Sequence, residues 1–366
     1  MTRETPLHAV HERLGASFTD FAGYQMPVRY SSDLAEHHAV RQGAGLFDLS
    51  HMAEIECEGP QVEQFLDYAL SNSLSALVDG QAKYSLLLAE DGGVIDDLIV
   101  YRLGEHKYLI VANAANRDAA VEAMQARSAG FDVRVSDTSD DWALIALQGP
   151  LAAGILESAP ITFETPLSEL RYYRIMGGRF GDHDVLIART GYTGEDGMEI
   201  FIHSGQAESL WNALMEAGGD QLTLCGLACR DTLRLEAGMP LYGHELSRDV
   251  TPAQAGLAGV VVNAKESFVG KDKALGEKSS RVLVGLSAEG KRAPRAEYPV
   301  LDHEGTVIGE ITSGALSPTL GFPIAMAFVE AAHREVGQEL VVDVRGASLP
   351  VTVTSLPFYS RKKVTS

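Results

Sequence analysis

The stretch "KYSLLLAEDGGVIDDLIVYRLGEHKYLIVAN", residues 83–113, predicts a meander of three antiparallel β-strands. Runs of aliphatic and β-branched residues are typical of buried strands, and the Asp-Gly pair at 91–92 is a strong hairpin signal. A second turn is predicted at "GEHK", residues 104–107. The central strand carries two adjacent carboxylates, although aspartate is depleted in strands and is rarely buried without a partner.

Strand geometry separates Asp96 from Asp97, because neighbouring side chains point to opposite faces of a sheet. The expected companions of Asp97 are Ile95, Ile99 and Tyr101, and those of Asp96 are Val94, Leu98 and Val100. The two carboxylates are therefore not expected to form a catalytic dyad. One is predicted to face a cavity, and the other to face solvent or a structural hydrogen bond. The alternative for either is an aspartate held by backbone N–H groups near the turn.

The bulk composition is that of an ordinary globular protein with more than one domain. A chain of 366 residues is too long for one hydrophobic core. The start, "MTRETPLHAVHERLG", does not resemble a signal peptide, and no apolar run is long enough to span a membrane. The formal net charge of −20 argues against a nucleic-acid partner.

The cysteines are few and odd in number: Cys57, Cys225 and Cys229. In a chain without a secretory signal, this pattern predicts a reducing cytoplasm. Cys225 and Cys229 are four residues apart and are a candidate metal pair, but no second Cys or His pair stands at zinc-finger spacing. Small buried side chains are the favoured interpretation, and no metal site is predicted.

Beyond the first fifty residues, which are predicted to be largely helical, one order of elements occurs twice. Gly-Pro pairs open a helix at 59–60 and at 149–150, an offset of 90 residues, and the helices that close each unit align at the same offset. This pattern predicts a diverged duplication of one α+β unit, although strand-then-helix patterns are common and the identity between the copies is low. From about residue 282, short β-runs alternate with turns and predict a small barrel or sandwich.

Two further stretches carry candidate ligand-binding groups. "RTGYTGEDGMEIF", residues 189–201, has closely spaced glycines, and the Glu199 carboxylate could accept two hydrogen bonds from a flat ring. Arg230, with Arg234 one turn further on, could bind a carboxylate in a bidentate manner. The alternatives are a surface glutamate and a salt bridge to a neighbouring carboxylate. From these residues an enzyme with a flat anionic ligand, a binding module and an oligomer scaffold all remain open.

Seven blocks resemble the aminomethyltransferases of the glycine cleavage system, the T-protein family. They are "TPLHAVHERLGASFTDFAGYQMPVRY", "HHAVRQGAGLFDLSHM", "YSLLLAEDGGVIDDLIVY", "VANAANRD", "RTGYTGEDGMEIF", "CGLACRDTLRLEAGMPLYGHEL" and "GEITSGALSPTLGFPIAMAFV". The blocks follow one another in the order found in the family. One departure is Tyr24, where tryptophan is more usual, and it replaces one aromatic side chain by another.

The resemblance implies an α+β fold of three domains, arranged as a cloverleaf around a central folate site. Two related α/β-sheet domains, the first of them discontinuous, would precede a C-terminal β-barrel or jelly-roll-like domain. The implied boundaries are residues 1–52 with 140–255 for folate-binding domain 1, 53–139 for domain 2, 256–280 for a linker region, and 281–366 for the barrel domain.

The implied reaction transfers the one-carbon unit of an aminomethyl-lipoyl carrier, the H-protein, to tetrahydrofolate, with release of ammonia and formation of 5,10-methylenetetrahydrofolate. By resemblance, Asp97 is the catalytic carboxylate, and tetrahydrofolate is a co-substrate in a reaction without a metal. The residues implied to bind folate are Tyr84, Asn113, Tyr172, Tyr192, Glu199, Arg230 and Arg361. The H-protein is expected to dock on a basic area, for which "GKRAPR", residues 290–295, is the candidate; the alternative is a solvated turn.

Three alternative functions are compatible with a resemblance to this fold. An iron–sulfur-related folate-binding maintenance protein would have a Lys-Gly-Cys-Tyr-x-Gly-Gln motif, but the corresponding stretch is "KESFVGK", with Ser267 in place of the cysteine. A tetrahydrofolate-dependent demethylase is the closer rival, and the full "GGVIDDLIVY" and "LRLEAGMPLYGHEL" blocks favour the transferase. A non-catalytic folate-binding protein would have no use for Asp97 as an acid–base group.

Overall fold

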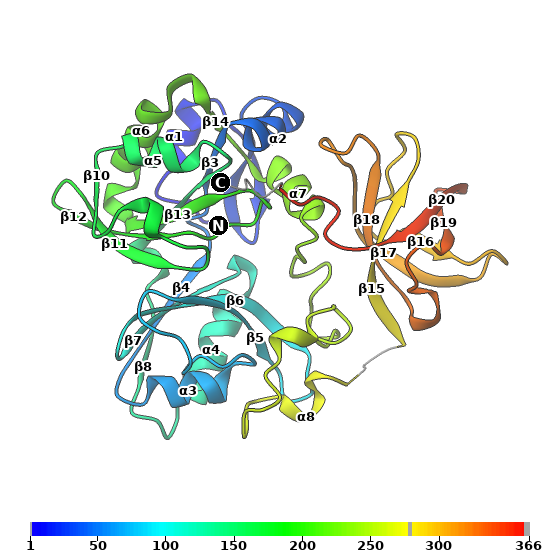
Figure 1. The fold of residues 1–366 in the computed structure, drawn as a ribbon, viewed down its shortest axis with the longest axis horizontal. Coiled ribbons are helices and arrows are strands. Elements are labelled where there is room, and N and C mark those ends of the chain that lie inside the picture. Colours follow the sequence, from blue (N-terminus) through cyan, green and yellow to red (C-terminus); the bar gives the residue numbers. More distant parts are fainter. Residues whose placement is uncertain (1, 277–279, 362–366) are drawn as a thin grey trace.

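A computed structural model describes residues 2–276 and 280–361 of the chain. Within these residues the chain forms a seven-stranded sheet, a five-stranded sheet, a closed six-stranded barrel and a two-stranded hairpin. Figure 1 shows three lobes, with the two large sheets on one side and the barrel, coloured yellow to red, on the other. The predicted fold class, two α/β-sheet units followed by a β-barrel, is confirmed. Among the described helices, none has both the length and the apolar character needed to cross a bilayer.

The five-stranded sheet contains the predicted meander. Its strands, in the order β5-β6-β7-β4-β8, are β5 (Ala82–Leu88), β6 (Val94–Gly104), β7 (Lys107–Ala112), β4 (Ala53–Glu58) and β8 (Arg134–Asp137). One face packs against α3 (Val62–Ala69) and α4 (Arg117–Arg127), with Phe65 and Met124 in the shared core. The other face is directed toward the seven-stranded sheet, and Tyr101 and Leu109 lie in the core between them.

A β-bulge in β6 changes which residues share a face. Asp97 pairs with Leu86, Asp96 with Leu87, and Val94 with Leu88, so that Ile95 is the extra residue. Beyond the bulge the predicted alternation is confirmed, because Leu98 and Val100 lie in the core under the helices and Ile99 and Tyr101 on the opposite face. At the bulge it is wrong: Ile95 packs on the helix side, and Val94 packs on the other.

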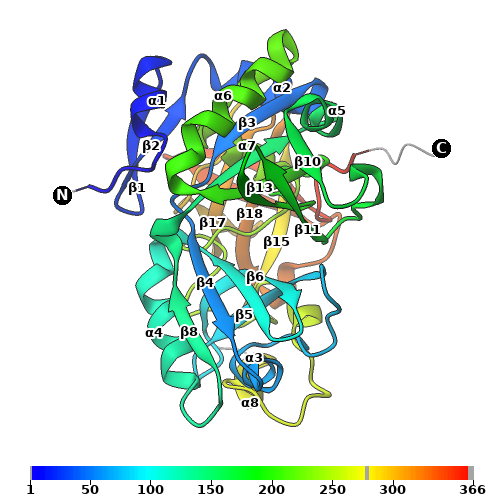
Figure 2. The ribbon, with the colours of Figure 1, turned by 90° about the vertical axis from the view of Figure 1, so that its left-hand side faces the viewer.

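The seven-stranded sheet has the order β10-β11-β12-β13-β9-β3-β14. Its strands are β10 (Ile161–Phe163), β11 (Ile175–Phe180), β12 (His183–Ala188), β13 (Gly197–His203), β9 (Trp142–Gln148), β3 (Ala44–Asp48) and β14 (Leu222–Leu224). Neighbours are antiparallel except β3 and β14, which are parallel. Helices α5 (Ala152–Ser158) and α6 (Ala207–Gly218) cover one face around the fully buried Trp211. Figure 2 shows these helices above the sheet and the five-stranded sheet below it.

The prediction that the first fifty residues are largely helical is wrong in part. Helices α1 (His8–Arg13) and α2 (Asp33–Gln42) flank a hairpin of β1 (Ser17–Phe21) and β2 (Tyr24–Arg29). The turn of this hairpin has positive φ at Ala22 (53°) and Gly23 (80°), the conformation of a tight primed turn. The sequence does not predict this turn, because it has Ala-Gly in place of the usual Asn-Gly or Asp-Gly pair and alanine rarely adopts a positive φ.

The predicted duplication is confirmed in the order of the strands. The series β5-β6-β7-β4 in one sheet has the same order as β11-β12-β13-β9 in the other. The Gly-Pro pairs stand at equivalent turns, where Gly59 and Gly149 have φ of 151° and 129°. A Cβ atom would lie 2.4 Å from the carbonyl oxygen of Asp132 at the first turn and of Gly43 at the second. Both units therefore keep glycine at this position for the same steric reason.

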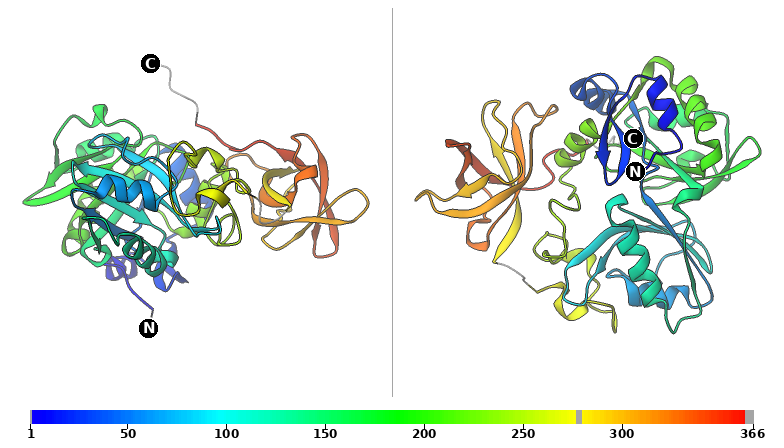
Figure 3. Two further views of the ribbon diagram at one scale, coloured as in Figure 1. Left: turned by 90° about the horizontal axis from the view of Figure 1, so that it is seen from below. Right: turned by 180° about the vertical axis from the view of Figure 1, so that it is seen from behind.

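The barrel closes in the order β15-β18-β17-β16-β19-β20. Its strands are β15 (Arg281–Ala288), β16 (Pro299–Leu301), β17 (Val307–Leu316), β18 (Pro323–Glu330), β19 (Glu339–Val344) and β20 (Ala347–Thr354). The segment before it, which includes α8 (Lys271–Ala274), packs Phe268 and Ala274 against Leu86 and Val94 of the five-stranded sheet. Figure 3 shows this segment passing along that sheet on its way to the barrel. The domain boundaries drawn from the sequence remain a prediction.

Helix α7 (Leu227–Glu236) connects the seven-stranded sheet with the barrel through buried charges. Arg234 is 1% exposed and donates to Glu245 (2.9 Å) and to Ser313 of β17 (2.8 Å). Glu236 is fully buried and accepts from Arg41 of α2 (2.8 Å) and from the Thr319 hydroxyl (2.7 Å). Although burial opposes it, hydrogen bonds to His37, Ser317 and Thr319 lower the pKa of Glu236 to about 2. The carboxylate is therefore ionised at neutral pH.

We expect Arg234→Met to destabilise the protein strongly. It leaves Glu245 as a buried charge without its arginine, and breaking a buried ion pair in this way costs about 3–5 kcal/mol. Arg179→Met, which breaks the exposed pair with Asp184, is the matched control and should change the free energy of unfolding by less than about 1 kcal/mol. Urea unfolding of both variants measures the difference. Equal effects of the two substitutions would contradict the structural role of Arg234.

Candidate active site

Asp97 is held at both carboxylate oxygens by side chains from neighbouring strands. The Tyr84 hydroxyl of β5 donates to Oδ2 at 3.0 Å, and the Asn113 amide, just after β7, donates to Oδ1 at 2.8 Å. Asn113 Nδ2 also lies 3.0 Å from the Asp97 carbonyl oxygen. Burial raises the pKa of Asp97 to about 6, although the bonds from Tyr84 and Asn113 work in the opposite direction. At neutral pH the carboxylate is mostly ionised and close to its titration range.

Asp96 is fully buried on the opposite side of the strand and has its own set of donors. Its carboxylate accepts from the backbone N–H of Asn113 (2.9 Å), from Asn113 Nδ2 (2.8 Å) and from Asn116 Nδ2 (2.6 Å). Burial and the charge of Asp97 raise the pKa of Asp96. The predicted structural hydrogen bond is therefore present. The two carboxylates are nevertheless linked, although strand alternation places them on opposite faces, because the Asn113 side-chain nitrogen donates to both.

Glu199 and Arg230 supply the other charges of the site. Glu199 of β13 is 8% exposed and accepts from the Thr190 hydroxyl, which in turn lies 3.1 Å from the Tyr101 hydroxyl. Burial raises the pKa of Glu199, opposed by Thr190 and by the charge of Arg230. Burial also lowers the pKa of Arg230 against the effect of Glu199, and the Arg230 Nη1 atom is buried without a hydrogen-bond partner.

Tyr192 lies beside Arg230. The guanidinium carbon of Arg230 is 4.9 Å from the centroid of the Tyr192 ring, a cation–π contact. Burial raises the pKa of Tyr192; Asp97 raises it further and Arg230 lowers it, which places both charges near the ring. The Tyr192 hydroxyl donates to the carbonyl oxygen of Pro240. The structure thus brings together six of the eight residues singled out from the sequence: Tyr84, Asp97, Asn113, Tyr192, Glu199 and Arg230.

Tyr172 and Arg361 lie at the edge of this group. Tyr172 is 51% exposed, and its ring is edge-on to Tyr173 with 4.9 Å between the centroids. Burial raises the pKa of Tyr172, an effect that the charge of Arg361 opposes, so these two side chains are near each other. Arg361 is exposed and pairs with Asp196 at 3.3 Å. Both are available to a ligand that extends outward from the buried charges.

Sequence reasoning missed two supporting residues, Asn116 and Thr190. Each acts on a charged side chain from a distance along the chain, Asn116 on Asp96 and Thr190 on Glu199. Asn116 stands in the block "VANAANRD", where the second asparagine, three residues after Asn113, is the only local signal. Arg234, considered beside Arg230 as a candidate carboxylate binder, serves the buried ion pair described above instead.

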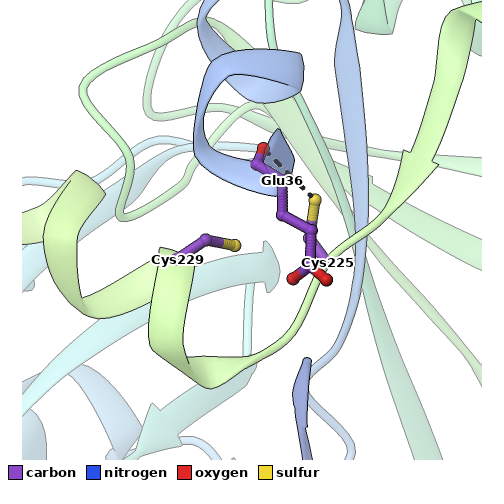
Figure 4. Close-up of side chains that lie close together, drawn as sticks. All are labelled: Glu36, Cys225 and Cys229. Atoms are coloured by element: carbon purple, nitrogen blue, oxygen red, sulfur yellow. Dashed lines mark hydrogen bonds between the residues drawn. The ribbon is translucent and has the colours of Figure 1, made fainter. Parts of the chain in front are cut away.

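Cys225, Cys229 and Glu36 form a tight cluster between α2 and α7 (Figure 4), with their potential ligand atoms within 4.8 Å of one another. The Glu36 carboxylate already accepts from the backbone N–H groups of Tyr30 (2.8 Å), Ser31 (2.9 Å) and Gly226 (2.9 Å). The Cys225 thiol donates to the Glu36 carbonyl oxygen, and burial raises its pKa well above the ordinary value. These hydrogen bonds fit the predicted role of small buried side chains.

The fold and the site together define a multi-lobed α+β protein in which buried carboxylates face tyrosines and an arginine with a free donor. Comparison with known proteins gives the family. The GCVT N-terminal domain matches residues 7–265, and the glycine cleavage T-protein C-terminal barrel domain matches residues 281–360. The chain belongs to the glycine cleavage T-protein family.

Individual relatives are similar over nearly their whole length. A protein named aminomethyltransferase from Cutibacterium acnes is 57% identical over 367 residues, which is 98% of this chain and 99% of the relative. Another from Saccharopolyspora erythraea is 53% identical, with 98% of each chain covered. The crystal structure of glycine cleavage system aminomethyltransferase T from Bartonella henselae has a TM-score of 0.91 at 39% identity, with 98% of each chain covered.

We expect Cys57, Cys225 and Cys229 to be unreactive toward a thiol reagent in the native protein, because all three are buried and free and the thiolate is the reactive form. Labelling should become complete only in denaturant. We also expect addition of Zn²⁺ or a chelator to leave the melting temperature unchanged. Rapid native labelling of two thiols, or stoichiometric retention of Zn²⁺, would contradict the structural assignment of the cluster.

Proposed function

We propose that this chain is the aminomethyltransferase of glycine cleavage. It transfers the one-carbon unit from the aminomethyl-lipoyl arm of an H-protein to tetrahydrofolate, with release of ammonia and formation of 5,10-methylenetetrahydrofolate. The observation that carries the proposal is the Asp97 carboxylate, held by Tyr84 and Asn113 and close to its titration range. Relatives of 53–57% identity with the name aminomethyltransferase support it.

Asp97 is the catalytic residue of the proposal. As an ionised carboxylate it orients the folate, assists proton movement as N5 attacks the methylene carbon, and stabilises the iminium-like cation that forms when the amine leaves. The reaction balances without a redox partner. The protons that leave N5 and N10 of tetrahydrofolate end on the departing ammonia and on the lipoyl sulfur, and no metal ion takes part.

The folate-binding residues of the proposal divide by chemistry. Glu199 accepts hydrogen bonds from the amino edge of the pterin, as a carboxylate can from two adjacent N–H groups. Arg230, whose Nη1 atom lacks a partner, takes the polar or glutamyl part of the folate, and Arg361 is the second candidate for the anionic tail. The residues that line the site are Tyr84, Asn113, Tyr172 and Tyr192.

The carrier protein is proposed to dock on the barrel. The three cations of the run "GKRAPR" are exposed: Lys291, Arg292 and Arg295. Lys291 also donates a 2.9 Å hydrogen bond to the carbonyl oxygen of Gly321 in the β17–β18 loop. The cations of residues 290–295 would attract an acidic carrier, although the whole chain has a net charge of −20. A cytoplasmic location, suggested by the free cysteines, and the domain boundaries predicted from the sequence belong to the same proposal.

We expect Asp97→Asn to lower the rate of ammonia release from an aminomethyl-loaded carrier by about 10²–10⁴-fold, the usual contribution of a positioned acid–base group. Tetrahydrofolate binding should change far less, since asparagine keeps the shape of the side chain. Asp184→Asn, on the exposed β11–β12 hairpin, is the control and should keep full turnover. Full turnover of Asp97→Asn would contradict its role. Formation of methyl-tetrahydrofolate from a methyl-donor substrate, in place of transfer from the carrier, would indicate a demethylase, and folate binding without any turnover by the wild type would indicate a binding protein.

We expect transfer to lose rate as the pH falls through about 6, because protonation removes the Asp97 charge. The Tyr84 hydrogen bond lowers the pKa of Asp97 by stabilising the ionised form. Tyr84→Phe should therefore shift the acid limb of the pH–rate profile to higher pH. Tyr68→Phe, at an exposed position, serves as the control. An acid limb that stays in place or moves to lower pH in Tyr84→Phe would contradict this assignment.

A further inference from the structure

Asp96 is an unusual residue to bury beside a second carboxylate. It is fully buried, and its strand neighbours Leu98 and Val100 lie in the apolar core under α3 and α4. A buried carboxylate is tolerated only where hydrogen bonds replace its hydration. Three N–H donors do so here, and all of them come from Asn113 and Asn116.

The hydrogen bonds of Asp96 fix the orientation of the Asn113 side chain. One Asp96 oxygen accepts from the Asn113 backbone (2.9 Å), and the other accepts from the Asn113 side-chain amide (2.8 Å). This two-point contact directs the NH₂ group of Asn113 toward the carboxylates and its amide oxygen away from them. The same NH₂ group bonds to Asp97 Oδ1 at 2.8 Å. The chain of contacts runs from Asn116 to Asp96, then to Asn113 and Asp97.

The twin unit shows that the local fold does not require this arrangement. His203, the last residue of β13, occupies the position of Asn113, which directly follows β7, and each immediately precedes a 3₁₀ turn. The His203 side chain accepts from the Gly205 N–H and so caps its own turn. The Asn113 side chain makes no such cap. The Asn113 side chain bonds instead to the two carboxylates, Asp96 and Asp97.

We propose that Asp96 and Asn116 are positioning residues for aminomethyl transfer, which hold Asn113 so that it fixes the Asp97 carboxylate. The proposal rests on the function proposed above. Asp97 is then held from two directions, by Tyr84 on β5 and by the Asp96–Asn113 unit at the end of β7. The charges of Asp96 and Asp97 also interact, so the two carboxylates titrate as one coupled pair and not independently.

The first test is Asp96→Asn, which keeps the shape of the side chain and removes its charge. Loosened positioning should lower kcat by roughly 10- to 100-fold, as small misplacements of reacting groups do, with the Kd for tetrahydrofolate within about threefold of wild type. The two carboxylates titrate as a coupled pair, so the variant should also replace their joint titration by that of Asp97 alone and thereby change the acid limb of the pH–rate profile. A purely structural role would move neither kcat at saturation nor the pH profile.

Asn116→Ala is the second test, for the case that Asp96→Asn does not fold. It removes one donor to Asp96 and should also lower kcat without weakening folate binding. Asp137→Asn is the control: Asp137 bonds to Arg117 (2.8 Å) and Ser139 (2.6 Å), so its loss should reduce stability and leave the pH profile in place. Wild-type kcat and an unmoved pH profile in both test variants, with Asp97→Asn inactive, would overturn the positioning role alone. Absence of ammonia release by the wild-type enzyme would instead overturn the proposed function.

Discussion

The buried charges of α7 are the constraint on which the arrangement of the lobes depends. Arg234 and Glu236 lie too deep to be hydrated, so each must find partners within the protein. Their partners come from elsewhere in the fold: Glu245, Ser313 of the barrel, Arg41 of α2 and Thr319 of the β17–β18 loop. Because these bonds have short range and defined directions, satisfying them sets the barrel against the seven-stranded sheet. Arg230 stands one turn earlier on the same helix, and so the cation of the site is positioned by the same bonds.

The site contains buried charged groups whose ionised forms are incompletely stabilised by the protein, and a bound ligand can supply the missing partners. Burial raises the pKa of Asp96, of Asp97 and of Glu199, which means that each carboxylate is less stable as an ion than it would be in water. Arg230 is close by, but its Nη1 atom has no partner. A ligand with N–H groups at one end and an anionic group at the other would satisfy both kinds of group at once. A flat polar heterocycle with an acidic tail has this chemistry.

The sequence predicts those parts of the fold that depend on local periodicity. The meander of residues 83–113, the duplication and the barrel are each written in alternating patterns or turn residues that need no knowledge of distant contacts. The bulge at Ile95 and the hairpin at Ala22 are missed because each is a local backbone exception without its usual sequence signal. The link between Asp96 and Asp97 is missed for another reason. Strand alternation separates the two side chains correctly, but an asparagine at the end of the adjacent strand reaches both.

The two related units show where chemistry enters a duplicated fold. Both keep the glycine of the Gly-Pro turn, because any Cβ there would collide with a backbone carbonyl. They differ after the third strand of the meander, where His203 caps its turn and Asn113 does not. Leaving a turn without its side-chain cap and burying a second carboxylate both reduce stability. A sequence maintained only for folding has no reason to accept both at one place. The departure of one copy from the other therefore marks the residues that serve Asp97, and it does so independently of the family to which the chain belongs.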